Sequence, residues 1–367
     1  MIHIILPGGA FWILDECRLR LCFRIPLLRL DLARILLGIL LATAFAYYLS
    51  NVGGALNVDE AWHAEIGYAF VAQGNIFYQP NVVDHPPLWR YFVGLSQLVL
   101  GRSSLGVRFP SAVLAVLTGA VTYVLCSRIW SRSIGLFSSA ALLFSPFFGT
   151  FAVEGTPDMA SVFFEGVLLM LVATCLIGGT TLSRAVLIGL FSGLALGDRY
   201  NMAAIILPIF LAMYMFRKGR PSLKHSLVIA LALLGALLIV FGPYLLTPVK
   251  SVQYFLGPII TDLGGTTGSM FVFTSQPRWI FADYLRQYVP FSFCALILGH
   301  LLLFVKRTPA KTLLILTADA YLLSISFLPV RFPRYLLPLL APSTALIFGL
   351  TADIVAAVMP KLWRTGA

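Results

Sequence analysis

Long apolar segments separated by short polar ones extend along nearly the whole chain. About 20 apolar residues in a helix are enough to cross the hydrocarbon core of a bilayer. The pattern predicts an all-α polytopic membrane protein with about ten transmembrane helices. The expected spans are Leu32–Ser50, Ser111–Ser127, Ile134–Thr150, Met159–Ile177, Ala185–Leu196, Met202–Phe216, Ser226–Leu246, Val289–Val305, Thr312–Leu328 and Tyr335–Val358.

One further apolar segment, Pro87–Leu100, is short for a span and carries Arg90 near its start. The positive-inside rule decides whether it crosses the membrane. With ten spans and a cytoplasmic N-terminus, 17 of the 26 Lys and Arg residues lie inside and 9 outside; with eleven spans the split is 13 to 13. We therefore expect Pro87–Leu100 to be a juxtamembrane helix in a long external loop.

This topology divides the chain into segments. Residues 1–30 form a cytoplasmic or interfacial N-terminal segment, without a cleavable signal peptide because Ile4–Leu14 lacks a basic leader. Residues 31–358 form the transmembrane domain, with external loops at 51–110 and 247–288, and residues 359–367 form a cytoplasmic tail. The loop at 247–288 is either a lid over an acceptor site or a plain surface connector, and the sequence favours neither. Gly189, Gly193 and Gly197 are spaced for close helix packing.

Composition agrees with a membrane protein, because 59% of the residues are hydrophobic and only 11% are charged. The net charge of +11 does not indicate a nucleic-acid partner, since excess Lys and Arg in such a protein mark cytoplasmic loops. Five scattered cysteines form neither a disulfide framework nor a zinc site.

The few acids are concentrated on the predicted outer side, above all at Asp59-Glu60 and Glu154–Asp158. Two classes of function suit such acids. A transporter or flippase would use charges inside the spans, for which Glu165 and Asp319 are candidates. A group transferase outside the cytoplasm would take its group from a lipid-linked phosphate. It needs a carboxylate base, arginines for the departing phosphate and an apolar groove for the lipid.

Five segments, in order, resemble the GT-C glycosyltransferases, especially the protein O-mannosyltransferase and lipid A aminoarabinose transferase group. They are VDEAWHAEIGYAFVAQGNIFYQP, DHPPLWRYFVGL, GVRFPSAVLAVLTGAVTYVLCSRIW, LLFSPFFGTFAVEGTPDMASVFF and RYLLPLLAPSTALIFGL, within roughly Asp31 to Leu350. The resemblance implies a GT-C fold. It also implies an inverting transfer from a dolichyl or undecaprenyl phosphate sugar to a lipid, glycan or protein acceptor.

The resemblance also implies roles for single residues. Asp59 would be the catalytic base, supported by Glu60, and Asp158 the second acidic residue; the alternative is that these acids only favour helix N-termini. The donor phosphate would contact His85, Arg108, Arg199, Tyr200, Arg331, Arg334 and Tyr335, although some of these could be plain interfacial anchors. No cofactor is required, and Asp59 with Asp158 could hold a divalent metal.

Overall fold

The computed structural model describes residues 32–78, 86–251, 277, 279–303, 308–327 and 332–365, with side chains in α14 and α16 described up to His300 and Ala356. Within these ranges every regular element is a helix. The elements are α1 (Leu32–Asn51), α2 (Val58–Ala72), α3 (Leu88–Leu100), α4 (Ser104–Ile129), α5 (Arg132–Leu143), α6 (Pro146–Ala152), α7 (Asp158–Gly178), α8 (Leu182–Asp198), η2 (Tyr200–Met202), α9 (Ala203–Met215), α10 (Leu223–Leu245), α13 (Ile280–Tyr288), α14 (Pro290–Leu303), α15 (Pro309–Ser326), η4 (Pro333–Leu339) and α16 (Leu340–Thr365).

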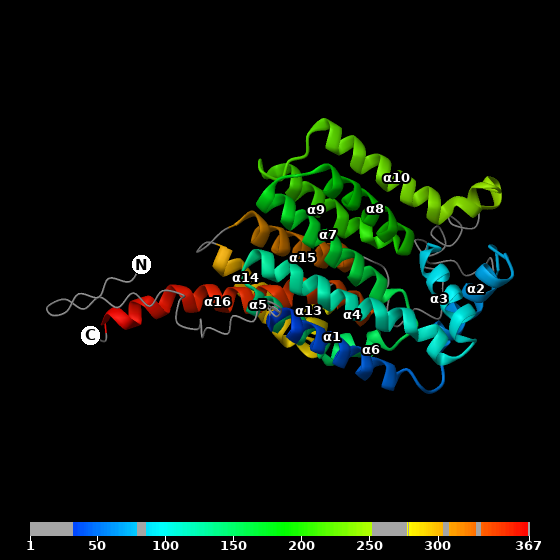
Figure 1. The fold of residues 1–367 in the computed structure, drawn as a ribbon, viewed down its shortest axis with the longest axis horizontal. Coiled ribbons are helices and arrows are strands. Elements are labelled where there is room, and N and C mark those ends of the chain that lie inside the picture. The colour runs from blue at the N-terminus through cyan, green and yellow to red at the C-terminus, as the bar shows by residue number, and fades with distance from the viewer. Residues whose placement is uncertain are drawn as a thin grey trace, which may run out of the picture.

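Most helices run roughly along one direction as a bundle, with α7 near its centre and α10 along one side (Figure 1). The core follows from this arrangement, because α7 is buried along almost its whole length and contacts α4, α8, α9 and α15. A 21-residue helix is about 31 Å long, close to the thickness of the hydrocarbon core.

The predicted spans coincide with helices, and the all-α prediction is confirmed. In the described residues, five helices are long and apolar enough to cross a membrane, or six if α5 and α6 together form one span; the number ten stays a prediction. The span expected over Ile134–Thr150 consists of two helices, and whether they cross the membrane as one span stays a prediction. The chain bends by 66° between α5 and α6, at Pro146, which cannot donate a backbone hydrogen bond to a continuing helix.

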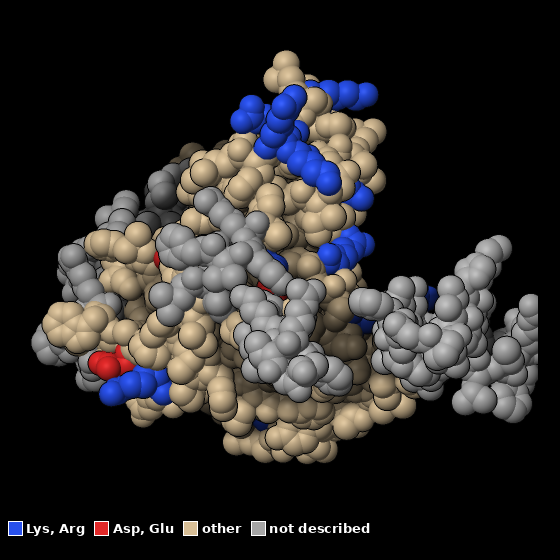
Figure 2. Space-filling model, turned by 90° about the vertical axis from the view of Figure 1, so that its left-hand side faces the viewer, with Lys and Arg blue, Asp and Glu red and all other residues tan. Residues whose placement is uncertain are grey.

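Two helices of the predicted external loop, α2 and α3, pack together at one end of the bundle (Figure 1). At 13 residues α3 is about 20 Å long and too short to span, as the charge distribution predicts. Figure 2 looks onto the opposite end, where Lys and Arg side chains gather toward one side. Exposed Arg217, Lys218 and Arg220 belong to the connection between α9 and α10.

The glycine spacing in α8 has the predicted effect on helix packing. A Cβ atom added to Gly189, Gly193 or Gly197 would meet α10 at unattainably short distances; at Gly193 it would lie 2.6 Å from both the Ala236 Cβ and the Leu233 carbonyl oxygen. The α8 and α10 backbones therefore approach so closely because no side chain separates them.

Replacing Gly193 with alanine should destabilise the protein by about 1–3 kcal/mol, because the added methyl group must push α10 away. Thermal or denaturant unfolding in detergent measures the effect. Gly235→Ala is the matched control, since nothing lies within 4 Å of its added Cβ. Equal stability of the two variants would contradict the close packing of α8 on α10.

Candidate functional site

The site begins at the first turn of α2, where Asn57 and Glu60 cap the helix. The Asn57 side chain accepts from the Glu60 backbone N–H at 2.9 Å, and Glu60 Oε2 accepts from the Asn57 backbone N–H at 2.9 Å. This reciprocal capping box satisfies two amides that the helix leaves unpaired. It places Asp59 beside Glu60 in the first turn, but with a different environment.

Glu60 is buried against Arg108 of α4. Its carboxylate accepts from Arg108 Nε at 2.6 Å, from Arg108 Nη2 at 2.8 Å and from the backbone N–H of Gly155 at 2.8 Å. Although burial opposes ionisation, these donors together lower the pKa of Glu60 below its ordinary value. A carboxylate held this way is a poor base, so the geometry does not favour Glu60 as a proton acceptor.

Arg108 has no donor left for a phosphate. Besides its bonds to Glu60, its Nη1 donates to the carbonyl oxygens of Val52 and Gly53 at 2.9 and 2.7 Å, and its Nη2 donates to that of Ala55 at 2.9 Å. A guanidinium has five N–H donors, and all five are engaged. The predicted phosphate contact does not fit this geometry, which instead ties α4 to the segment between α1 and α2.

Asp59 is accessible. Its side chain is 54% exposed, and its Oδ2 accepts from Arg334 Nη1 at 2.9 Å. Arg334 lies in η4, where Pro333 and Pro338 restrict the chain to a 3-10 helix before α16. The contact joins positions 275 residues apart in the chain.

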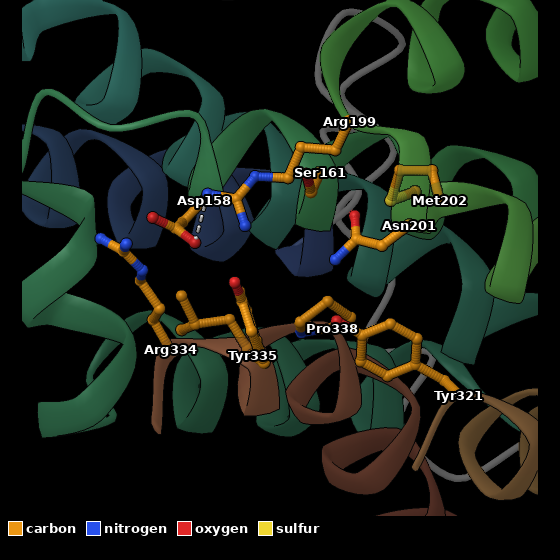
Figure 3. Close-up of a pocket in the computed structure, with 10 residues that line it drawn as sticks. Asp158, Ser161, Arg199, Asn201, Met202, Tyr321, Arg334, Tyr335 and Pro338 are labelled. Carbon is orange, nitrogen blue, oxygen red and sulfur yellow. Dashed lines mark ion pairs between the residues drawn. The ribbon is translucent and has the colours of Figure 1, made fainter. Parts of the chain in front are cut away.

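Arg334 also lines a pocket with Asp158, the first residue of α7, and Arg199, at the end of α8. Arg199 Nη2 lies 2.9 Å from Asp158 Oδ1, and both side chains are buried. Figure 3 shows the two guanidinium groups approaching the Asp158 carboxylate from opposite sides, with Tyr335 beneath them. Within the described residues, neither Nε–H finds a hydrogen-bond acceptor.

Glu154 lies in the turn between α6 and α7 and is half-buried. Burial, followed by the nearby charges of Asp158 and Glu60, raises its pKa to about 7, while Arg334 and Arg108 oppose the rise. A carboxyl group that titrates near neutral pH beside a pocket is a sign of function.

The structure thus brings together only some of the predicted site residues. Asp158, Arg199, Arg334 and Tyr335 line one pocket, and Asp59 joins it through Arg334. Tyr200 is 37% exposed and is not among the residues that line this pocket. His85 and Arg331 lie outside the described residues.

The pocket also contains residues that the sequence analysis did not single out, namely Ser161, Asn201, Met202, Tyr321, Leu337 and Pro338. Two had a usable signal: Ser161 is one helical turn after Asp158, and Asn201 follows the predicted Arg199-Tyr200 pair. No sequence pattern marks Tyr321 as a site residue, because a single tyrosine in an apolar span is typical of the helix core.

A metal between Asp59 and Asp158 stays a prediction. Each carboxylate is paired with an arginine, so a cation would have to displace a guanidinium group. In the part of the chain that the structure describes, no three His, Cys, Asp or Glu side chains gather as a metal site.

Solved structures share this architecture, which is the GT-C fold. ArnT from Cupriavidus metallidurans bound to undecaprenyl phosphate matches with a TM-score of 0.68 and 15% identity over 87% of this chain and 60% of that chain. Archaeal oligosaccharyltransferase AglB from Archaeoglobus fulgidus, in complex with an inhibitory peptide and a dolichol-phosphate, matches with a TM-score of 0.58 and 16% identity over 92% and 52%.

Sequence comparison agrees. The family model described as dolichyl-phosphate-mannose-protein mannosyltransferase matches residues 84–246. An undecaprenyl phosphate-alpha-4-amino-4-deoxy-L-arabinose arabinosyl transferase of Pseudomonas savastanoi pv. phaseolicola (strain 1448A / Race 6) is 32% identical over 114 residues, 29% of this chain and 21% of the relative. The chain has the GT-C fold, and its long apolar helices are those of an integral membrane protein. It spans little more than half the length of the solved structures it matches.

Proposed function

We propose that this protein is an inverting glycosyltransferase that moves a sugar from a dolichyl or undecaprenyl phosphate to an acceptor hydroxyl. The observation that carries the proposal is the pocket in which Arg199 and Arg334 flank Asp158. Each arginine keeps a buried Nε–H that is not bonded to any described residue. Guanidinium groups bind phosphate through several N–H donors at once, and a buried donor costs free energy until an acceptor arrives.

The residues divide the reaction between them. Arg199 and Arg334 hold the phosphate of the donor, with the Tyr335 hydroxyl beside them. Asp59 takes the proton of the acceptor hydroxyl while that oxygen bonds to the anomeric carbon from the face opposite the phosphate. The bond between the anomeric carbon and the phosphate oxygen breaks, and polyprenyl phosphate leaves with the electron pair. One displacement inverts the anomeric configuration.

We place this site on the extracytoplasmic face of the cell membrane. The helices α2 and α3 lie at the end opposite to the basic connection between α9 and α10 (Figures 1 and 2). Because basic ends of membrane proteins face the cytoplasm, the site end faces outward. The partners are then a polyprenyl-phosphate-linked sugar, membrane lipids and a lipid, glycan or protein acceptor.

A flippase of isoprenoid-linked sugars is the alternative, and it would depend on charges inside the bundle. Glu165 is fully buried in α7 two turns below Asp158, and neither carboxylate oxygen bonds to a described residue. Asp319 of α15 instead pairs with His300 of α14 at 2.7 Å on a half-exposed surface. The accessible Asp59 and the paired arginines gather at one end of the bundle, which favours transfer over transport.

Arg334→Gln and Arg199→Gln should each weaken binding of polyprenyl phosphate by roughly 10- to 100-fold, the effect of losing a charged hydrogen-bond donor. Binding to the purified protein in nanodiscs measures the change. Arg286→Gln is the matched control, because that side chain is 75% exposed on α13. Wild-type affinity in both pocket variants would refute this assignment of the phosphate site.

A further inference from the structure

The acids and arginines around the pocket do not match in number. Asp59 pairs with Arg334, Glu60 with Arg108 and Asp158 with Arg199, each at hydrogen-bond distance. Each of these three arginines therefore already pairs with a carboxylate. Asp198 and Glu154 are two further carboxyl groups. Asp198 is fully buried and accepts from Ser161 at 2.8 Å, whereas within the described part of the chain no ion pair or hydrogen bond is made by the Glu154 side chain.

The backbone around Glu154 is held firmly in place. The next residue, Gly155, donates its N–H to Glu60 at 2.8 Å and accepts at its carbonyl oxygen from Trp89 Nε1 at 3.2 Å. Gly155 also packs directly on Val107 of α4, where a Cβ atom would clash. Helices α2, α3 and α4 thus hold the backbone of the residue that follows Glu154.

Four charged groups on four elements act on Glu154. Asp158 of α7 and Glu60 of α2 repel its ionised form, whereas Arg334 of η4 and Arg108 of α4 attract it. Both arginines already serve another carboxylate, so their charge is largely compensated. A donor phosphate between Arg199 and Arg334 would bring a further negative charge next to this group.

We propose that Glu154 takes up a proton from solvent when the anionic donor phosphate binds, and that this residue thereby sets the pH dependence of donor affinity. The inference rests on the proposed function, because it assumes a phosphodiester in the pocket of Arg199 and Arg334. Ionised Glu154 is a negative charge without an arginine of its own, and its protonation removes that charge before the donor adds another. Glu154 is a positioning residue in this account, since it acts through the charge of the site.

The direction of the pH effect follows from the raised pKa of about 7. Below pH 6 Glu154 is already protonated, so affinity is high and constant. Above pH 7 the free protein must take up a proton to bind, and affinity falls by at most tenfold per pH unit. Because the bound state stays protonated, the Kd should rise about 30-fold from pH 6 to pH 8.5.

The test measures the Kd of a polyprenyl phosphodiester, which keeps one negative charge from pH 5.5 to 9, with the full chain in nanodiscs. Glu154→Gln should bind tightly across this range, with no rise in Kd. Glu65→Gln is the matched control, because Glu65 is half-exposed and pairs with Arg102, and neither residue lines the pocket. It should keep the wild-type pH dependence. Unchanged pH dependence in Glu154→Gln, or its loss in Glu65→Gln, would overturn the inference.

A second measurement does not depend on how the control variant folds. Calorimetric titration at pH 7.8 in two buffers of different ionisation enthalpy counts the protons taken up per donor bound. We expect nearly one for wild type and nearly none for Glu154→Gln; equal counts reject the role of Glu154. One outcome would reject this inference alone: the donor binds, Arg334→Gln weakens that binding, and the affinity does not depend on pH. The proposed function would then stand. If wild type binds no donor at any pH, both fail.

Discussion

Replacing Asp59 with asparagine should reduce sugar transfer by about 10²- to 10⁴-fold, the usual contribution of a general base. Asparagine has nearly the same shape, and its side-chain oxygen can still accept from Arg334, which donates to Asp59 at 2.9 Å. Donor affinity should therefore stay within a few-fold of wild type. Single-turnover transfer at saturating donor separates the chemical step from binding.

Glu65→Gln is the control for this prediction. Glu65 is an acid of the same helix, half-exposed and paired with Arg102, and it should tolerate the change with near-normal transfer. Two results would contradict the role of Asp59. One is transfer by Asp59→Asn within a few-fold of wild type, and the other is an equal loss in both variants.

The second large effect concerns stability. Glu60→Gln should destabilise the protein by about 3–5 kcal/mol, because it leaves the Arg108 guanidinium buried without its countercharge. Arg108→Met should lower the stability by a similar amount, because the buried Glu60 carboxylate and the carbonyl groups that accept from Arg108 would lose their hydrogen-bond donor. Unfolding of the purified variants in detergent measures both.

The double variant Glu60→Gln with Arg108→Met tests whether the two residues act as a pair. It should be more stable than the sum of the single losses predicts, because no buried charge is left alone. Glu65→Gln again serves as control, since a half-exposed pair contributes less than about 1 kcal/mol. If Arg108→Met were fully stable but bound the donor poorly, Arg108 would be a phosphate ligand after all.

Hydrophobic length and charge asymmetry predicted most of the fold. Nearly every expected span is a helix, and α3 is as short as the charge distribution required. The break between α5 and α6 was missed because hydropathy averages over Ser145 and Pro146 without weighing the lost hydrogen bond. Helix bends depend on backbone chemistry, which apolar character does not report.

The site could be predicted only in part, because similar local patterns lead to different environments. Arg108 and Arg334 both lie within two residues of a proline near the start of a helix. All donors of Arg108 are used by Glu60 and carbonyl oxygens, whereas Arg334 reaches Asp59 and the pocket. The two arginines differ in their partners: Arg108 bonds to Glu60, 48 residues away in the sequence, and Arg334 bonds to Asp59, 275 residues away. Such distant pairings arise only from packing, and so does the contribution of Tyr321 to the pocket.

The central claim is that the protein transfers a sugar from a lipid phosphate. The most direct measurement reconstitutes wild-type protein in liposomes with radiolabelled polyprenyl-phosphate mannose, then with other sugar-lipids, and a mixed extract of lipid, glycan and protein acceptors. Transfer of the label and movement of the lipid between leaflets are recorded in the same sample. We predict transfer with inversion at the anomeric carbon and release of polyprenyl phosphate. Movement of intact sugar-lipid across the bilayer, without transfer from any donor, would contradict the account and identify a flippase.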